Sequence, residues 1–461
     1  MTAAPTYPIM ITTPEKAVAL DTLTVVLGLF GVQILLPAVL IVATPKRSIL
    51  RFLAIPCLGY AAYQVFELAP ALSKNLFHVS FLSCVGLLIT AHCINLLLIL
   101  NGGLTWSDMV RNRAGAASAD FFSKVISAAR LVVSLRGVNT AWETKNLPQH
   151  PGSLGKQTGR ASFLLRQAAT LLWQYLFLDL LLESARHEPP ENMAKYFGQG
   201  MEFEYFSLSR EKWVHRVFAT FFTWFAVGRV LLDSSWRASS LIFVGLGIDR
   251  PENWRPLFGS VWEAYTLRNF WGKYWHQLLR WPFTSNTNFL LRQVLHFPRP
   301  TALERYTNNF LVFLLSGLLH AKAARLFGLS MVESGAIQFF TSFALGYIIE
   351  DIVQAIYQKI TRKSDKDKTA VWEKLAGFTW VLFWLSITYP WYLYPSQRAL
   401  NGTPAWTLPY HIADKLGSEG MLGLLVGDDR NGKHILVADK EPAKWSAQNN
   451  QMDNWIKTRE L

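Results

Sequence analysis

Long stretches of nearly uncharged, apolar sequence constrain the fold of this 461-residue chain more than any other feature. About twenty apolar residues form a helix that crosses ~30 Å of hydrocarbon, and only a helix pairs all its backbone polar groups within its own segment there. The sequence therefore predicts an all-α, polytopic membrane protein with about eight transmembrane helices, at 20–43, 52–72, 77–100, 162–184, 214–233, 306–327, 334–357 and 375–394.

The rest of the chain is organised around these spans. A further apolar run, 239–248, is too short to cross a bilayer alone, and we expect it to be re-entrant or interfacial. Residues 1–400 are predicted to form one membrane-embedded domain, and 401–461 a polar tail with an Asn-Gly-Thr at Asn401, a candidate glycosylation acceptor. No basic segment precedes an apolar core at the N-terminus, so we expect no cleaved signal peptide.

Basic residues are concentrated in the loops. The net charge of +13 would suggest a nucleic-acid partner in a soluble protein. Here Lys and Arg cluster between the spans, above all in 101–161 and 249–305, which is the positive-inside pattern. We therefore expect these loops to be cytosolic, both termini and the tail to be lumenal, and no nucleic acid to bind.

Cysteines and repeats give little support to other functions. Cys57, Cys84 and Cys93 lie inside predicted spans without the spacing of metal ligands, so we expect packing roles and no metal site. No internal repeat is visible, whereas inverted repeats would have favoured a transporter.

Ionisable residues inside spans are costly and are candidates for function. Most of those in this chain lie near the ends of spans, where long side chains can reach the interface, and Arg229 and Asp233 are spaced to pair with each other. The set is Glu67, His92, Asp179, Arg229, Asp233, His320, Lys322, Arg325 and Glu350.

His320 lies well inside its span. On a helix, Asn309, Phe313, Ser316 and His320 share one stripe, with Gly317 beside it. The small residues one turn before the histidine predict a hollow for a ligand, although a helix-packing notch uses small residues too. Histidine accepts a proton near neutral pH, so His320 is a candidate general base; the alternative is a histidine hydrogen-bonded between helices.

The stretch RNFWGKYWHQLLR, residues 268–280, combines aromatic and basic residues. If helical, it places Leu267, Trp271, Tyr274 and Leu278 on one face, and Asn269, Lys273, His276 and Arg280 on the other, before Pro282 ends the helix. This pattern predicts an amphipathic helix at the cytosolic interface. It serves either as an anchor or as the mouth of a site where Lys273 and Arg280 attract an anion.

These residues together resemble a known family. FWGKYWHQLLR, followed about forty residues later by SGLLHA in a span, resembles the wax-synthase-like branch of the membrane-bound O-acyltransferases. RGVNTAWETKNLP, residues 136–148, is similar to a motif of the fungal members that acetylate hydroxyls of terpenoids and meroterpenoids. The resemblance covers about 130–395.

The resemblance implies an enzyme of the endoplasmic reticulum membrane that transfers an acetyl group from acetyl-CoA to a hydroxylated terpenoid-type acceptor, with no tightly bound cofactor. His320 matches the family's catalytic histidine. His276 matches a second polar position that is often asparagine, which leaves its role open between orienting the thioester and donating a hydrogen bond. The implied acyl-CoA contacts are Arg268, Asn269, Trp271, Lys273 and Arg280, and the implied substrate pocket contains Asn309, Phe313, Ser316 and Gly317.

Three alternatives remain at this stage. A wax ester synthase would use the same chemistry on long-chain acyl-CoA and a fatty alcohol. A transporter would use His320 and the carboxylates of the spans as a relay and would ignore acyl-CoA. A non-catalytic scaffold would keep only the fold.

Overall fold

The chain folds into a bundle of helices. The computed structural model describes residues 16–110, 119–149, 159–362 and 369–413, so most of the predicted tail 401–461 lies outside the described residues. The helices are α1 (Lys16–Ala43), α2 (Ile49–Leu68), α3 (Leu76–Ile94), α4 (Trp106–Val110), α5 (Phe121–Val132), α6 (Arg160–Arg186), α7 (Glu191–Phe197), α8 (Arg210–Phe222), α9 (Gly228–Gly245), α10 (Leu267–Asn269), α11 (Arg280–Phe289), α12 (Ala302–Ala324), α13 (Ala336–Thr361), α14 (Val371–Thr388) and α15 (Pro390–Ala399).

Six segments of the described chain are long and apolar enough to cross a membrane. They are Asp21–Ala43, Ile49–Ala71, Leu76–Gly102, Arg210–Gly245, Ala302–Phe327 and Ala336–Thr361. The predicted spans at 162–184 and 375–394 are also helical, in α6 and across α14 and α15, but they are not among these six. The predicted helical membrane class is confirmed, and the number of eight spans stays a prediction.

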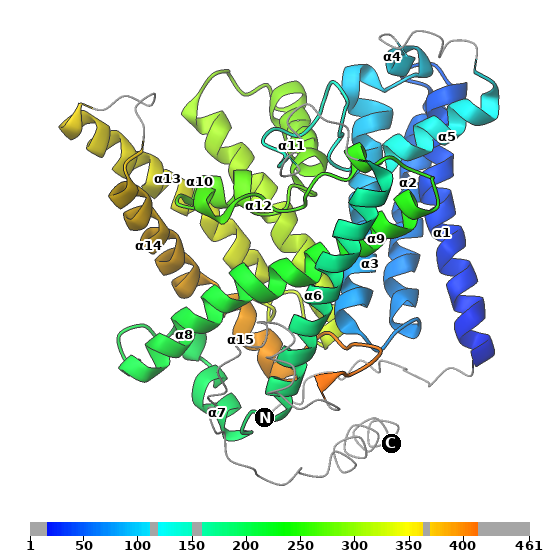
Figure 1. Cartoon of the computed structure of the whole chain (residues 1–461). Coiled ribbons are helices and arrows are strands. Elements are labelled where there is room, and N and C mark those ends of the chain that lie inside the picture. The colour runs from blue at the N-terminus through cyan, green and yellow to red at the C-terminus, as the bar shows by residue number, and fades with distance from the viewer. Residues whose placement is uncertain (1–15, 111–118, 150–158, 363–368, 414–461) are drawn as a thin grey trace, which may run out of the picture.

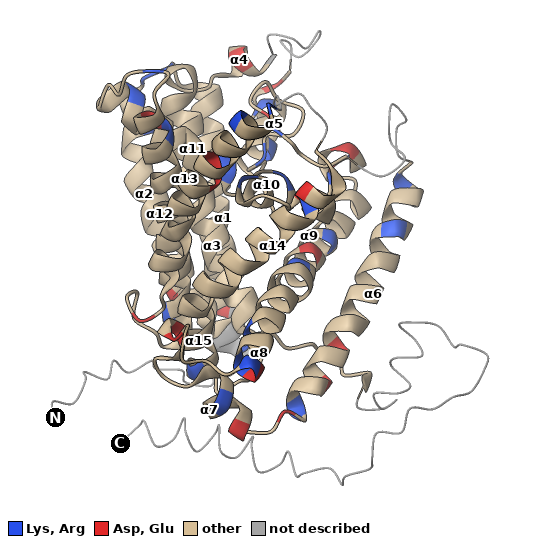
Figure 2. Ribbon diagram, turned by 90° about the vertical axis from the view of Figure 1, so that its left-hand side faces the viewer, with Lys and Arg blue, Asp and Glu red and all other residues tan. Residues whose placement is uncertain are grey.

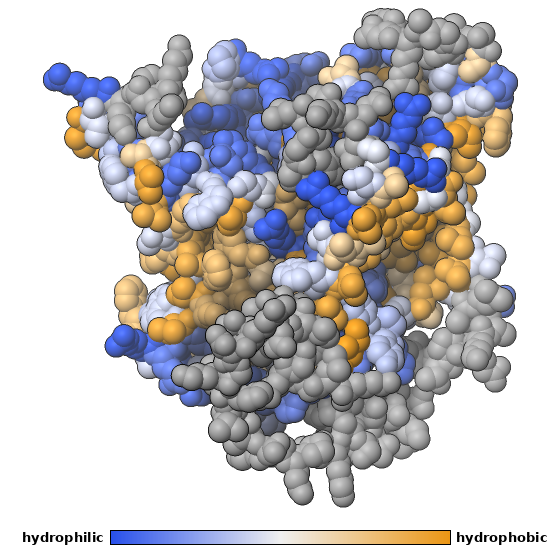
Figure 3. All heavy atoms as spheres, viewed as in Figure 1, coloured by the Kyte–Doolittle hydropathy of each residue, from blue (hydrophilic) through white to orange (hydrophobic). Residues whose placement is uncertain are grey.

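The two ends of the bundle are polar and its middle is apolar. The turn between α1 and α2, helices α4, α5 and α11, the last turn of α13 and the first turn of α14 lie at one end, whereas α7 and α15 lie at the other (Figure 1). Charged residues gather toward the ends of the ribbons (Figure 2), and hydrophobic residues form a band across the middle of the face shown in Figure 3. The described parts of the predicted cytosolic loops therefore share one end, here called the basic end.

Buried polar side chains hold the first three helices together. The Gln33 amide in α1 donates to the carbonyl of Gly86 at 3.0 Å and to the Thr90 hydroxyl at 3.1 Å, both in α3. Arg51 of α2 is fully buried and donates to the backbone oxygens of Thr44, Leu40 and Leu97 at 2.9–3.4 Å. Such bonds are favoured where no water can replace them.

The apolar run 239–248 is not a separate re-entrant segment, and that prediction is wrong. Helix α8 continues through a π-helical turn, Thr223–Val227, directly into α9, which ends at Gly245. Residues 239–245 are therefore the last turns of a helix that starts at Arg210. The π turn keeps the backbone bonded while it inserts a residue, so no break separates the two helices.

The predicted amphipathic helix over 267–280 is also wrong. The chain forms one α turn, Leu267–Asn269, and one π turn, Phe270–Tyr274, and then becomes extended at Trp275. The Tyr274 carbonyl accepts from Gly259 N at 2.9 Å, and the Gln277 amide donates to the Trp271 carbonyl at 2.8 Å. These outside partners take the carbonyls that a continuing helix would use.

A new helix, α11, then starts at Arg280, so Pro282 lies in a first turn rather than after a last one. Phe270 and Tyr274 are fully buried in the main aromatic core, together with Trp224, Phe339 and Phe343. Tyr274 therefore faces the protein interior and not the lipid.

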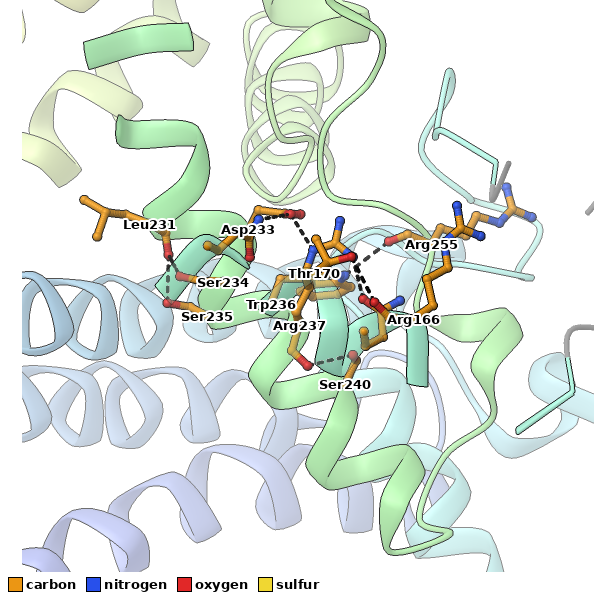
Figure 4. Close-up of polar contacts among 12 residues, drawn as sticks. Arg166, Thr170, Leu231, Asp233, Ser234, Ser235, Trp236, Arg237, Ser240 and Arg255 are labelled. Atoms are coloured by element: carbon orange, nitrogen blue, oxygen red, sulfur yellow. Dashed lines mark hydrogen bonds and ion pairs between the residues drawn. The ribbon is translucent and has the colours of Figure 1, made fainter. Parts of the chain in front are cut away.

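The sequence had suggested that Asp233 pairs with Arg229. In the structure it pairs with Arg237 instead. The Arg237 Nε donates to Asp233 Oδ2 at 2.6 Å, its Nη1 donates to Gln167 Oε1 at 2.6 Å, and the Gln174 amide donates to Asp233 Oδ2 at 2.7 Å. The network links α9 to α6, and Figure 4 shows Asp233 and Arg237 on the α9 side of that contact. Two further residues on α6 are what decide which arginine Asp233 binds.

We expect Asp233→Asn to destabilise the protein without removing its activity. A hydrogen bond between charged groups contributes about 1.5–3 kcal/mol, and its loss should lower the thermal unfolding midpoint of detergent-purified protein. Glu252→Gln, which neutralises an exposed carboxylate, is the control. The double variant Asp233→Asn/Arg237→Gln should regain part of the lost unfolding midpoint. It removes the Arg237 charge that Asp233→Asn alone leaves unpaired inside the protein, and such a charge destabilises the fold more than a neutral side chain does. An unchanged midpoint in Asp233→Asn would contradict the assignment.

Candidate active site

Helix α12 places His320 inside the bundle and fixes its ring. Thr301 caps the start of α12, where its hydroxyl accepts from Glu304 N at 3.2 Å. Four residues before the histidine, the Ser316 carbonyl lies 2.8 Å from His320 Nδ1. A carbonyl only accepts, so Nδ1 must carry the hydrogen and Nε2 keeps its lone pair. This is the tautomer that a general base needs.

Aromatic rings from two other helices enclose the His320 imidazole. The Phe340 ring of α13 lies 4.3 Å from it, centroid to centroid, and the Tyr392 ring of α15 lies 6.1 Å away, edge-on. His320 itself is part-buried. The site is therefore apolar around the base and has access for a small group.

The second histidine, His276, comes from the segment that follows the π turn. Its ring lies 5.6 Å from that of Trp275 and 6.1 Å from that of Phe258, and its Nδ1 is buried without a hydrogen-bond partner among the described residues. Burial, with repulsion from His320 and Arg136, lowers the pKa of His276 to about 3. The ring is thus neutral at physiological pH, and the two histidines are close enough to interact electrostatically.

The stripe predicted on α12 is only partly open. Phe313 packs on the Trp271 and Phe343 rings at 5.8 and 5.4 Å, and Asn309 Nδ2 is buried without a partner among the described residues. A Cβ on Gly317 would lie 2.9 Å from Ile337 Cα. The space beside Gly317 is therefore filled by the backbone of α13, so the packing notch replaces the predicted hollow at this residue.

A cavity of about 240 Å³ lies near His320 at the end opposite the basic loops. Tyr392 belongs both to its wall and to the rings around His320. Polar side chains of Ser396 and Gln397 also line it, together with the chain segment after α15. A larger groove of about 630 Å³ lies on α12 and α13. Neither histidine lines either hollow, but Tyr392 connects the smaller one to the His320 ring, so the smaller cavity is the better candidate for a substrate.

Two cations that the sequence had assigned to acyl-CoA are paired with carboxylates. Arg268 binds both oxygens of Asp351 at 2.9 Å, and Lys273 binds Glu263 at 2.9 Å. Arg280 donates to the carbonyl of Gly272 at 3.1 Å. The Asn269 backbone N–H donates to the Thr266 hydroxyl, which caps α10, and the Trp271 ring packs in the aromatic core.

The motif at 136–148 supports this segment from the basic end. Arg136 is buried, donates to the carbonyls of Pro256 and Arg255 at 2.8 and 2.7 Å, and stacks on Trp236. It therefore fixes the loop that contains Phe258, on which His276 packs.

The comparisons with known proteins identify the family of the chain. Residues 254–342, which include both histidines, match the model of the membrane bound O-acyl transferase family. The acetyltransferase atnC of Arthrinium sp is 58% identical over 405 residues, which cover 86% of this chain and 93% of that protein. The chain belongs to the membrane bound O-acyl transferase family.

Other relatives are also named acetyltransferases. The acetyltransferase spyB of Aspergillus fumigatus is 39% identical and aligns with 88% of this chain and 70% of its own length. The acetyltransferase TRI7 of Fusarium sporotrichioides is 34% identical, with coverages of 85% and 90%. No solved structure matches the chain.

As a member of this O-acyltransferase family, the protein is an integral membrane enzyme with an acyl-CoA co-substrate. Sequence reasoning missed Phe340 and Tyr392 as neighbours of His320, because no motif marks them and only the packing of α13 and α15 brings them there.

Proposed function

We propose that this acyltransferase moves the acetyl group of acetyl-CoA to a hydroxyl of a terpenoid or meroterpenoid in fungal secondary metabolism. The observation that carries the proposal is His320, with Nδ1 held by the Ser316 carbonyl and Nε2 left as a base, and with a second histidine, His276, that interacts with it electrostatically. The relatives are named acetyltransferases, which supports the choice of donor.

The chemistry follows from the tautomer of His320. Its Nε2 accepts the hydroxyl proton while the hydroxyl oxygen bonds to the thioester carbonyl carbon. The C–S bond then breaks, and the thiolate of coenzyme A takes the proton from the imidazolium. No acyl-enzyme is required, since Ser316 offers its carbonyl and not its hydroxyl to the histidine.

His276 has the complementary role in this proposal. A neutral imidazole has one N–H to donate, and burial keeps His276 neutral. We assign that N–H to the thioester oxygen, where negative charge develops in the transition state.

The cavity next to Tyr392 receives the acceptor in this proposal. Its apolar rings suit a terpenoid skeleton, and Ser396 and Gln397 can bind a second oxygen of the acceptor. Asn309 and Phe313 lie further toward the basic end of α12, from which the donor approaches. We place the enzyme in the endoplasmic reticulum membrane with its basic loops cytosolic, and we assign acyl transfer to residues 1–400.

Microsomes that contain the protein test the proposal directly. They are incubated with labelled acetyl-CoA or palmitoyl-CoA and with a panel of hydroxylated terpenoids and fatty alcohols. We expect acetylation of a terpenoid that depends on acetyl-CoA. Preferential transfer of palmitate to a fatty alcohol would instead identify a wax ester synthase, and transport of a solute without consumption of acyl-CoA would overturn the enzymatic proposal.

A further inference from the structure

Arg229 is a cation in a membrane-spanning helix whose charge no carboxylate neutralises among the described residues. Its partner expected from the sequence, Asp233, binds Arg237 instead. The Arg229 guanidinium lies 5.8 Å from the centroids of both the Phe258 and Tyr274 rings. Ionisable groups at such positions are normally paired or functional.

The cations nearest to His276 along the sequence are already engaged. Arg268 and Lys273 form ion pairs with Asp351 and Glu263, and Arg280 donates to backbone and amide oxygens. Using Lys273 or Arg280 to bind an anion would take it from Glu263 or from the carbonyl and amide oxygens that it now binds, whereas Asp351 would keep Arg305 and Tyr306 if Arg268 were withdrawn. Among the described residues, binding an anion at Arg229 would displace no carboxylate, because the neighbours of its guanidinium are the Phe258 ring and the Tyr274 side chain.

Arg229 is also close to the proposed reaction centre. Tyr274, over which it lies, precedes Trp275 and His276, and Phe258 contacts the His276 ring at 6.1 Å. The preceding residue, Gly228, packs on Trp275, so that an added Cβ would lie 3.6 Å from the indole. From there α9 runs toward the basic end (Figure 1).

We propose that Arg229 binds the pyrophosphate of acyl-CoA and so positions the thioester beside His276 and His320. This inference rests on the proposed use of acyl-CoA from the basic end. Arginine suits the task because its planar guanidinium donates two parallel hydrogen bonds to phosphate oxygens and stacks on aromatic rings. The pyrophosphate is the anionic group of the donor nearest to the thioester, and the flexible pantetheine arm joins the two.

Binding of unacylated donor fragments to detergent-purified protein tests this role without an acceptor. The probes are CoA, dephospho-CoA, 4′-phosphopantetheine and pantetheine, and the variants are Arg229→Gln and Arg229→Lys. We expect Arg229→Gln to weaken binding of the three phosphate-bearing probes by about 10-fold to 100-fold, as loss of a charged hydrogen bond implies. Pantetheine should bind the wild type and Arg229→Gln with equal affinity. The affinity of Arg229→Lys for the phosphate-bearing probes should lie between those of the wild type and Arg229→Gln.

The control is Arg250→Gln, which removes an exposed positive charge after the end of α9 and should not change any of the four affinities. Equal weakening of pantetheine and CoA in Arg229→Gln would show that Arg229 only supports the fold. Unchanged CoA binding would also overturn the proposal. Because no turnover is measured, either result is independent of whether the acceptor is a terpenoid.

Discussion

His320→Ala is expected to reduce acyl transfer by about 10²–10⁴-fold, the usual contribution of a general base. The substitution removes the His320 Nε2, the proposed base. Its lone pair is free because the other ring nitrogen, Nδ1, holds the hydrogen that bonds to the Ser316 carbonyl. Binding of CoA should persist, because the proposed donor contacts lie on α9 and on the segment around Tyr274. The rate is measured with purified protein at saturating acetyl-CoA.

His215→Ala is the matched control for this variant. His215 lies in α8 and stacks on Tyr196 at 3.9 Å, away from the α12 site, so transfer should remain near the wild-type rate. Turnover of His320→Ala at the wild-type rate would exclude His320 as the base. If Ser316→Ala were as inactive as His320→Ala, an acyl-serine intermediate would have to replace direct transfer.

The membrane-spanning helices could be predicted because lipid leaves the backbone little choice. An apolar segment such as 306–327 must be helical to pair its own N–H and C=O groups, and α12 covers most of it. The position of His320 on an inward stripe follows from helical spacing alone. Composition and hydropathy therefore sufficed for the fold class, whereas the role of His320 as a base stays a prediction that rests on the family resemblance.

The segment 267–280 could not be predicted in this way. Periodicity describes which face each side chain would occupy if the helix continued, but Gly259 and Gln277 bind the carbonyls that a helix would need. Gly259 can do so because it has no side chain; a Cβ there would lie 2.1 Å from the Lys273 carbonyl oxygen. This contact joins loops from different parts of the chain, and local sequence does not encode it.

Charge pairing failed for the same reason. The spacing of Arg229 and Asp233 fits an ion pair on one helix, yet Arg237 has the same spacing on the other side of Asp233 and also reaches Gln167 of α6. Gln167 on α6 therefore decides between the two arginines that have the right spacing to pair with Asp233. Arg229 is thereby left for another partner.

The second large effect is expected at His276, where we predict that alanine lowers the acyl-transfer rate by about 10²–10³-fold, as loss of one oxyanion donor does. Asparagine should retain much more activity than alanine, because its amide also donates a hydrogen bond. The effect should appear in kcat, since the bond to the thioester oxygen strengthens as charge develops in the transition state.

The pH dependence of the rate separates this role from that of a second base. With a pKa lowered to about 3 by burial, His276 stays neutral from pH 5 to pH 9, so it adds no ionisation to the rate profile in that range. His276→Asn should therefore change the height of the profile and not its shape. A limb near neutral pH that disappears in His276→Asn would show that His276 exchanges the proton itself. If the His276→Ala and His276→Asn variants were both as active as the wild type, His276 would have no catalytic role. The segment 268–280 would then only support Trp275 and the aromatic core.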